Sequence, residues 1–117
     1  MTVLAQPFVG VGIYAKGDAP GALHAQWARS DRISSAPEKG TVCGGAATGG
    51  PVNGFAGSYS IVYTDDQGKP GEPYKLIIKS AGDAYQLEWQ KDGQAKYFGV
   101  GIELDGKLVI GWAPSRL

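Results

Sequence analysis

Apolar and polar residues alternate along most of this chain with a period of two residues. Between Gly54 and Ala113, five successive segments follow this pattern. Successive side chains of a β-strand point to opposite faces of the sheet, so this period predicts half-buried strands. The side chains predicted to face the interior from these segments are Tyr59, Ile61, Tyr63, Tyr74, Leu76, Ile78, Tyr85, Leu87, Trp89, Phe98, Val100, Ile102, Leu108, Ile110 and Trp112.

The N-terminal part holds two weaker segments of the same kind, separated by a turn-rich loop over residues 15–21. From Ser30 to Gly50 the alternation fades. We expect an irregular connection over 32–40, and either a Gly-rich strand or a long loop over 41–48. The predicted inward residues of the two N-terminal segments are Val9, Val11, Ile13, Leu23, Ala25 and Trp27.

Two hairpins can be given a register by matching apolar faces across the turn. A four-residue loop over 80–83 pairs Ile78 with Tyr85, Leu76 with Leu87, Tyr74 with Trp89 and Lys75 with Glu88. At Asp105-Gly106, a two-residue loop would set an apolar strand face against a polar one. A three-residue loop over 104–106 is therefore expected, and it pairs Ile102 with Leu108, Val100 with Ile110 and Phe98 with Trp112.

About seven to eight strands follow one another at the spacing typical of sandwiches and barrels. A chain of 117 residues makes one domain. We therefore expect a single all-β domain over 1–117, built as an antiparallel meander. Closure into a barrel would remove the two exposed edges of such a meander, and a β-sandwich is the alternative.

A short near-repeat links the two ends of the chain. Gly10-Val11-Gly12-Ile13 recurs as Gly99-Val100-Gly101-Ile102, and each begins a hairpin whose second strand ends in Trp-Ala. The likeness fits an old duplication. It fits equally well two strands in equivalent settings, for instance neighbours where a sheet closes.

Charge and composition exclude several classes of partner. Eleven basic and eleven acidic residues cancel, and no long Lys/Arg run is present, so nucleic acid and anionic membranes are not expected partners. No apolar stretch approaches the roughly 20 residues of a membrane span. The N-terminus does not read as a signal peptide, which fits a cytoplasmic protein or a secreted one whose signal was removed.

Catalytic and metal-binding groups are scarce. His24, the single histidine, is predicted on the outer strand face, and Cys43 is expected to be a small buried residue. Glu88 and Glu103 are predicted to face outward, and Asp65-Asp66 to lie in a solvated turn. We expect no metal, no cofactor and no enzymatic activity. Acid–base chemistry by tyrosine or a carboxylate inside a barrel is the enzymatic alternative.

The aromatic residues on the apolar face supply the main functional hypothesis. They would form either a packed core or an interior that binds a small apolar or amphipathic ligand, with tyrosine hydroxyls as polar contacts. The candidate ligand-binding residues are Trp27, Tyr59, Tyr63, Tyr74, Tyr85, Trp89, Phe98 and Trp112.

Glycines within the strands suggest a second function. Gly10, Gly12, Gly99, Gly101 and Gly111 are all predicted on the face opposite the apolar one. Glycine in a strand marks a bend or a close approach of another chain. A flattened outer face could therefore support self-assembly into a homo-oligomer or contact with a protein partner, around a filled core.

A meander with Trp and Tyr on its inward face resembles the calycin barrels, the lipocalin and avidin groups. The strands that carry the likeness are Tyr85-Gln86-Leu87-Glu88-Trp89 and Leu108-Val109-Ile110-Gly111-Trp112. The lipocalin Gly-x-Trp signature is absent, because the first strand reads Gly10-Val11-Gly12-Ile13-Tyr14, and no avidin-type biotin motif matches. The resemblance implies an architecture, and no ligand or site is carried over from it.

Overall fold

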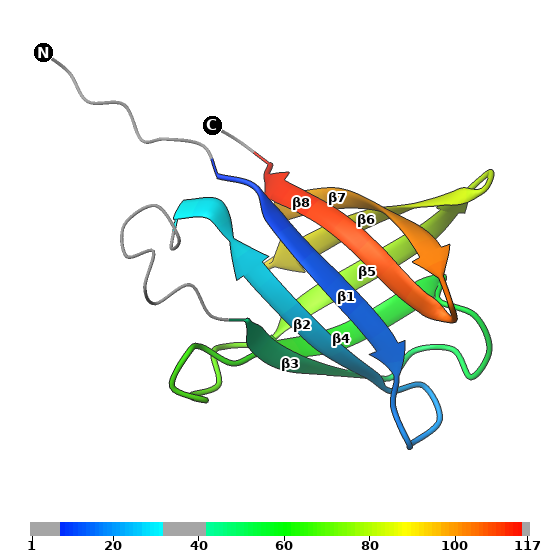
Figure 1. Ribbon diagram of the computed structural model, residues 1–117, viewed down its shortest axis with the longest axis horizontal. Coiled ribbons are helices and arrows are strands. Elements are labelled where there is room, and N and C mark those ends of the chain that lie inside the picture. Colours follow the sequence, from blue (N-terminus) through cyan, green and yellow to red (C-terminus); the bar gives the residue numbers. More distant parts are fainter. Residues whose placement is uncertain (1–7, 32–41, 116–117) are drawn as a thin grey trace, which may run out of the picture.

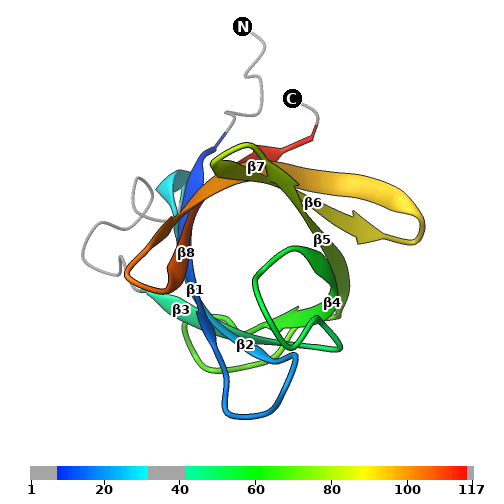
Figure 2. The same cartoon turned by 90° about the vertical axis from the view of Figure 1, so that its right-hand side faces the viewer.

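The computed structural model describes residues 8–31 and 42–115, which form an eight-stranded antiparallel barrel (Figures 1 and 2). Each strand pairs with the next along the chain, and β8 pairs with β1 to close the barrel. The expected meander and its closure are confirmed. The predicted connection over 32–40 lies outside the described residues, as does the N-terminus over 1–7. The strands are β1 (Gly10–Lys16), β2 (Leu23–Arg29), β3 (Cys43–Thr48), β4 (Gly57–Tyr63), β5 (Tyr74–Ala81), β6 (Ala84–Lys91), β7 (Gln94–Leu104) and β8 (Lys107–Pro114).

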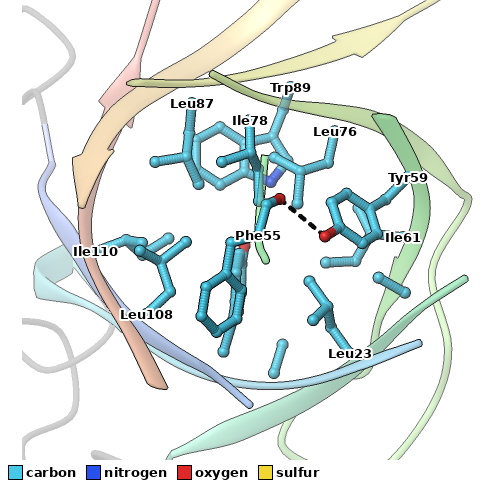
Figure 3. Packing of buried hydrophobic residues seen from close by; sticks show 13 residues of the cluster. Leu23, Phe55, Tyr59, Ile61, Leu76, Ile78, Leu87, Trp89, Leu108 and Ile110 are labelled. Carbon is cyan, nitrogen blue, oxygen red and sulfur yellow. Dashed lines mark hydrogen bonds between the residues drawn. The ribbon is translucent and has the colours of Figure 1, made fainter. Parts of the chain in front are cut away.

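The middle of the barrel is filled by aliphatic side chains from β2, β4, β5, β6 and β8. These residues are at most 4% exposed, and Figure 3 shows them meeting across the interior. Burial of each such side chain contributes about 1.5–3 kcal/mol to folding. The aliphatic layer consists of Leu23, Ile61, Leu76, Ile78, Leu87, Leu108 and Ile110.

One end of the barrel is closed by the loop between β3 and β4, which curls across the opening in Figure 2. This loop carries Phe55, which is 4% exposed and packs into the core cluster. The Tyr59 hydroxyl donates a hydrogen bond of 2.8 Å to the Phe55 carbonyl oxygen (Figure 3). The ammonium group of Lys16 lies 5.2 Å from the centroid of the Phe55 ring. Phe55 therefore acts as a plug for this end.

Strands β1 and β7 face the opposite way from the sequence prediction. Gly10, Gly12, Gly99 and Gly101 are buried, whereas the alternate positions of both strands are exposed. The cause is strand β8, which lies between them. Both Gly10 and Gly99 pair with Trp112, and both Gly12 and Gly101 pair with Ile110. The predicted inward residues that point outward instead are Val9, Val11, Ile13, Phe98, Val100 and Ile102.

These glycines leave room for the large inward side chains of β8. A Cβ atom added at Gly10 would overlap the indole of Trp112, and one at Gly99 would overlap the carbonyl oxygen of Gly111. The near-repeat thus occupies two equivalent settings, one on each side of β8. This placement accounts for the likeness by shared packing requirements and does not test a duplication.

Both predicted hairpin registers are wrong. The β7–β8 turn has two residues, Asp105 and Gly106, both with positive φ, as a type I′ turn requires. It pairs Glu103 with Leu108 and Gly101 with Ile110 in place of the expected partners. The β5–β6 loop also has two residues, so that Ile78 pairs with Leu87, Leu76 with Trp89 and Lys75 with Gln90. That shift spans two residues and preserves the predicted faces of β5 and β6.

Replacing Gly99 by alanine should destabilise the barrel by about 1–3 kcal/mol, because a new Cβ would collide with backbone rather than with a movable side chain. The matched control is Gly111→Ala on the neighbouring strand, where the nearest atom is the Gly10 carbonyl oxygen at 3.9 Å. Urea unfolding of both variants measures the difference. Equal stability of the two variants would contradict the packing account of the inward glycines.

Candidate functional site

The end of the barrel opposite the Phe55 plug carries a pocket of about 130 Å³. Odd-numbered strands begin at this end and even-numbered strands finish there, so residues distant in the sequence converge on it. Of the lining residues among the described parts of the chain, seven are aromatic. The lining consists of Gly12, Tyr14, Trp27, Arg29, Tyr63, Tyr74, Trp89, Tyr97, Ile110 and Trp112.

The aromatic walls meet mainly edge to face. The Trp27 ring stands at 80° to Tyr63 and at 66° to Trp112, with centroids 6.0 and 6.3 Å apart. Tyr97 packs against Trp112 at 85° and 5.3 Å, and against Tyr74 at 63° and 5.9 Å. These are the arrangements that the ring quadrupoles favour. Each of these rings packs against at least one other ring of the pocket.

The floor of the pocket is a hydrogen-bonded group of three side chains. The Trp89 Nε1–H donates to the Tyr63 hydroxyl at 2.6 Å, and the Tyr63 and Tyr14 hydroxyl oxygens are 2.6 Å apart. Burial raises the pKa of Tyr14 well above its ordinary value, and it also raises the pKa of Tyr63. Both phenols are neutral at ordinary pH and are poor proton acceptors in this position.

The rim carries a positive charge. Arg29, whose side chain is 22% exposed, binds Asp31 through Nε at 3.0 Å and Nη2 at 2.7 Å. Its guanidinium also lies 3.7 Å from the centroid of the Phe8 ring and 6.0 Å from that of Trp112. The two bonds to Asp31 use two of the five N–H donors of the guanidinium. Among the described lining residues, Arg29 alone is charged.

The eight aromatic residues predicted to bind a ligand divide into three groups. Five of them line the pocket: Trp27, Tyr63, Tyr74, Trp89 and Trp112. Tyr59 and Tyr85 lie at the plugged end, where Tyr59 bonds the Phe55 carbonyl and Tyr85 packs edge-on against the Phe55 ring at 6.3 Å. Phe98 is on the outer surface and 52% exposed, because the face of β7 is inverted.

Besides Gly12 and Ile110, three lining residues with aromatic or charged side chains were not among the predicted ligand-binding residues. Tyr14 and Tyr97 lie on the inverted strands β1 and β7, so the expected faces placed them outside. Arg29 continues the inward series of Leu23, Ala25 and Trp27 by one more period. Its position two residues after Trp27 indicates that it shares the inward face of the strand, although an arginine at a strand end is usually solvated.

The prediction for Glu103 is wrong. It lies on the inward-facing side of β7, where it accepts a hydrogen bond from the Tyr85 hydroxyl. This hydrogen bond is the main cause that raises the pKa of Tyr85. Glu103 is exposed at the rim of the plugged end, remote from the pocket. The tyrosine–carboxylate pair therefore exists, but it is outside the aromatic cavity.

The remaining candidate groups occupy ordinary structural positions. His24 is exposed on the outside of β2, Glu88 points outward from β6, and Cys43 is buried in β3 as a free thiol. The Asp65 carboxylate accepts backbone N–H bonds from Gln67 and Lys69, which holds a turn. No cluster of three or more His, Cys, Asp or Glu side chains suited to a metal occurs within residues 8–31 and 42–115.

Comparison with known proteins gives no match: no family model, no curated protein and no solved structure resembles this chain at a significant level. In the described part of the chain, no helix has the length and hydropathy needed to cross a membrane.

Replacing Tyr63 by phenylalanine should cost about 1–3 kcal/mol of stability, because it leaves the buried Trp89 N–H and the Tyr14 hydroxyl without their shared partner. Tyr85→Phe is the matched control, since its hydroxyl bonds an exposed carboxylate, and it should change stability by at most about 0.5 kcal/mol. Chemical denaturation of both variants makes the comparison. A Tyr63→Phe protein as stable as the control would rule out a supporting role for the hydrogen-bonded floor.

Alkaline pH should unfold the barrel. The pKa values of Tyr14, Tyr63, Tyr59 and Tyr74 are all raised in the folded state, mainly by burial. Folded phenols therefore retain protons that the unfolded chain releases near pH 10, so stability is full below about pH 10 and falls as pH rises above it. Tyrosinate absorbance and tryptophan fluorescence, followed together, report the process. Ionisation of all six tyrosines near pH 10 with unchanged fluorescence would contradict this.

Proposed function

We propose that this protein binds a small, planar, ring-shaped molecule with an anionic group in the aromatic pocket, without transforming it chemically. The observation that carries the proposal is the convergence of seven aromatic residues and one inward-aimed arginine on a single cavity, while the rest of the interior is filled.

The volume of the pocket sets the size of the ligand. At about 130 Å³ it is smaller than the roughly 300–1,000 Å³ of pockets that hold drug-sized molecules. It is close to the roughly 150 Å³ of an apolar protein cavity that accommodates benzene. A single ring with a short substituent therefore fits, whereas a fatty acid or a large heterocycle does not.

Polarity sets the chemistry of the two ends of the ligand. The floor is occupied by hydroxyl and indole groups that bond one another, so an apolar ring edge can rest there without leaving a polar group unpaired. At the rim, the Arg29 guanidinium has further N–H donors and carries a charge that favours a carboxylate. Asp31 already binds this arginine, so the ligand would share the cation with it.

The same lining argues for binding rather than catalysis. Among the described lining residues there is no carboxylate, histidine or cysteine. The floor tyrosines have raised pKa values, which makes them unsuitable as general bases.

Three probes of one size and shape test the proposal: benzoate, benzamide and benzamidinium, which differ in charge. All three tryptophans of the chain line the pocket, so intrinsic fluorescence reports occupancy directly. We expect benzoate to bind most tightly and benzamidinium most weakly. Concentrations up to about 10 mM are needed, because a Kd of about 1 mM corresponds to only about −4.1 kcal/mol.

Two variants separate the contributions of ring and charge. Arg29→Gln should abolish the preference for benzoate over benzamide and leave benzamide binding nearly unchanged. Lys79→Gln, on the exposed face of β5, is the control and should preserve the preference. At 10 times Kd a ligand stabilises the fold by about 1.4 kcal/mol, which raises Tm by roughly 5 °C. Absence of both quenching and stabilisation by all three probes would overturn the proposal.

A further inference from the structure

The outer surface of strands β7, β8 and β1 carries seven large exposed hydrophobic residues, called here the apolar face. Their exposed fractions range from 39% for Ile13 to 65% for Val100. They are Val9, Val11, Ile13, Phe98, Val100, Ile102 and Leu104. The adjacent outward residues of β6 and β2 are polar or small, and include Gln86, Glu88, His24 and Gln26. The apolar face is therefore a bounded patch on one side of the barrel.

Strand register makes this patch continuous. Val11 and Val100 both pair with Gly111, and Ile13 and Ile102 both pair with Val109. Cross-strand neighbours on one face lie about 5 Å apart, so these side chains form rows across three hydrogen-bonded strands. The outward residues of the central strand are Val109, Gly111 and Ala113. Because Gly111 has no side chain, the surface is lowest there, between Val11 and Val100. This strip of β8 is called here the furrow, and the outward residues of β1 and β7 beside it are the ridges.

The stability of the single barrel does not account for these residues. The interior is already filled by the aliphatic layer and the aromatic end, and on β1 and β7 the inward positions that face Trp112 and Ile110 are held by glycine. The ridge side chains point away from the core. Monomeric proteins rarely expose contiguous apolar patches larger than about 300–600 Å², and larger ones usually mark an interface.

The size of the apolar face matches what one half of a dimer needs. Seven residues that are each 39–65% exposed present together on the order of several hundred Å² of apolar surface. A standard protein interface buries about 800 Å² on each partner. Rim residues at the edges of the three strands would supply the remainder.

Charge and shape indicate that the partner is a second copy of the chain. The outward positions within residues 9–15, 98–104 and 109–113 hold no charged side chain, so the face can meet itself without opposing like charges. A two-fold axis near β8 would place a ridge of one copy against the furrow of the other. Sheets pack in this way about 10 Å apart, at a small angle between their strands.

We propose that this protein is a homodimer whose two barrels pack through the apolar face of β7, β8 and β1. The contacts inside each barrel stay unchanged in the dimer, and the aromatic pocket opens at the end of the barrel rather than on this side. Dimerisation is therefore independent of ligand binding.

The mass of the full chain in solution tests the proposal, measured by light scattering or sedimentation between about 1 and 100 µM, a range that brackets typical dimer affinities. We expect about 24 kDa, twice the 12.2 kDa of one chain. A mass of 12.2 kDa throughout this range would overturn the proposal. That result is expected if a different protein covers the face.

Substitutions within the apolar face test whether this surface forms the dimer interface. Val11→Glu combined with Val100→Glu places two carboxylates beside Gly111, at positions that are 61% and 65% exposed in the single barrel. We expect this variant to fold and its dimer Kd to rise by about 100-fold or more, because like charges would meet across the two-fold axis. Ser58→Glu combined with Ser60→Glu, on the exposed face of β4 across the barrel, is the control and should remain dimeric.

Far-ultraviolet circular dichroism and the Tm of each variant confirm that the barrels are folded. A folded Val11→Glu/Val100→Glu variant that stays dimeric would show that another surface is used and would overturn the proposal. Should that variant fail to fold, the mass of the unmodified chain still decides between a dimer and a monomer.

Discussion

The arrangement of this barrel depends on how strand β8 is accommodated between its two neighbours. Trp112 and Ile110 project inward from β8, and each faces a glycine on both adjacent strands. A side chain at Gly10 or Gly99 would occupy space that β8 already fills. Closure therefore leaves no room for a side chain on β1 or β7 at the positions that face Trp112 and Ile110, and the inward tyrosines of these strands, Tyr14 and Tyr97, lie beyond them. Because successive side chains of a strand point to opposite faces, the large apolar residues of β1 and β7 then lie on the outer surface of the barrel.

The interior is divided along the barrel axis by the same constraint. Aliphatic residues fill the middle, Phe55 closes one end, and the aromatic residues gather at the other. Tyrosine and tryptophan suit a barrel end, because their rings pack against the core while their polar atoms reach partners or water. The inward glycine Gly12 lines the pocket beside Ile110 and leaves part of this end unfilled. Arg29 completes the rim, so a cation stands over a largely apolar cavity.

The two proposals use different parts of the molecule and rest on different observations. Ligand binding is supported by the composition and size of the pocket at the open end. Dimerisation is supported by the outward apolar residues of the inverted strands. The glycines beside β8 bear on both, because they admit Trp112 and Ile110 into the barrel and leave the bulky residues of β1 and β7 on its surface. The interior is too full to hold a large molecule, which limits the size of the proposed ligand.

Local sequence patterns determined much of this fold. Period-two alternation identified the strands and the inward faces of β2, β4, β5, β6 and β8, because each of these follows the rule that large apolar residues point to the core. Turn chemistry was also informative: Asp105-Gly106 is the preferred sequence of a two-residue type I′ turn, and the structure adopts it. The sequence prediction set this signal aside in order to keep Phe98 and Val100 inside, and the register was wrong for that reason.

Only the tertiary structure decided which way β1 and β7 face, and hence which residues make up the site. Tyr14 and Tyr97 enter the pocket, whereas Phe98 leaves it, because of contacts with Trp112 and Ile110 on a strand that is distant from β1 in sequence. Five aromatic residues of the pocket were predictable from alternation within their own strands. The buried faces of β1 and β7 could not be predicted in this way. Alternation shows only that the two faces of a strand differ. Which of them is buried depends on the space that the side chains of β8 leave free.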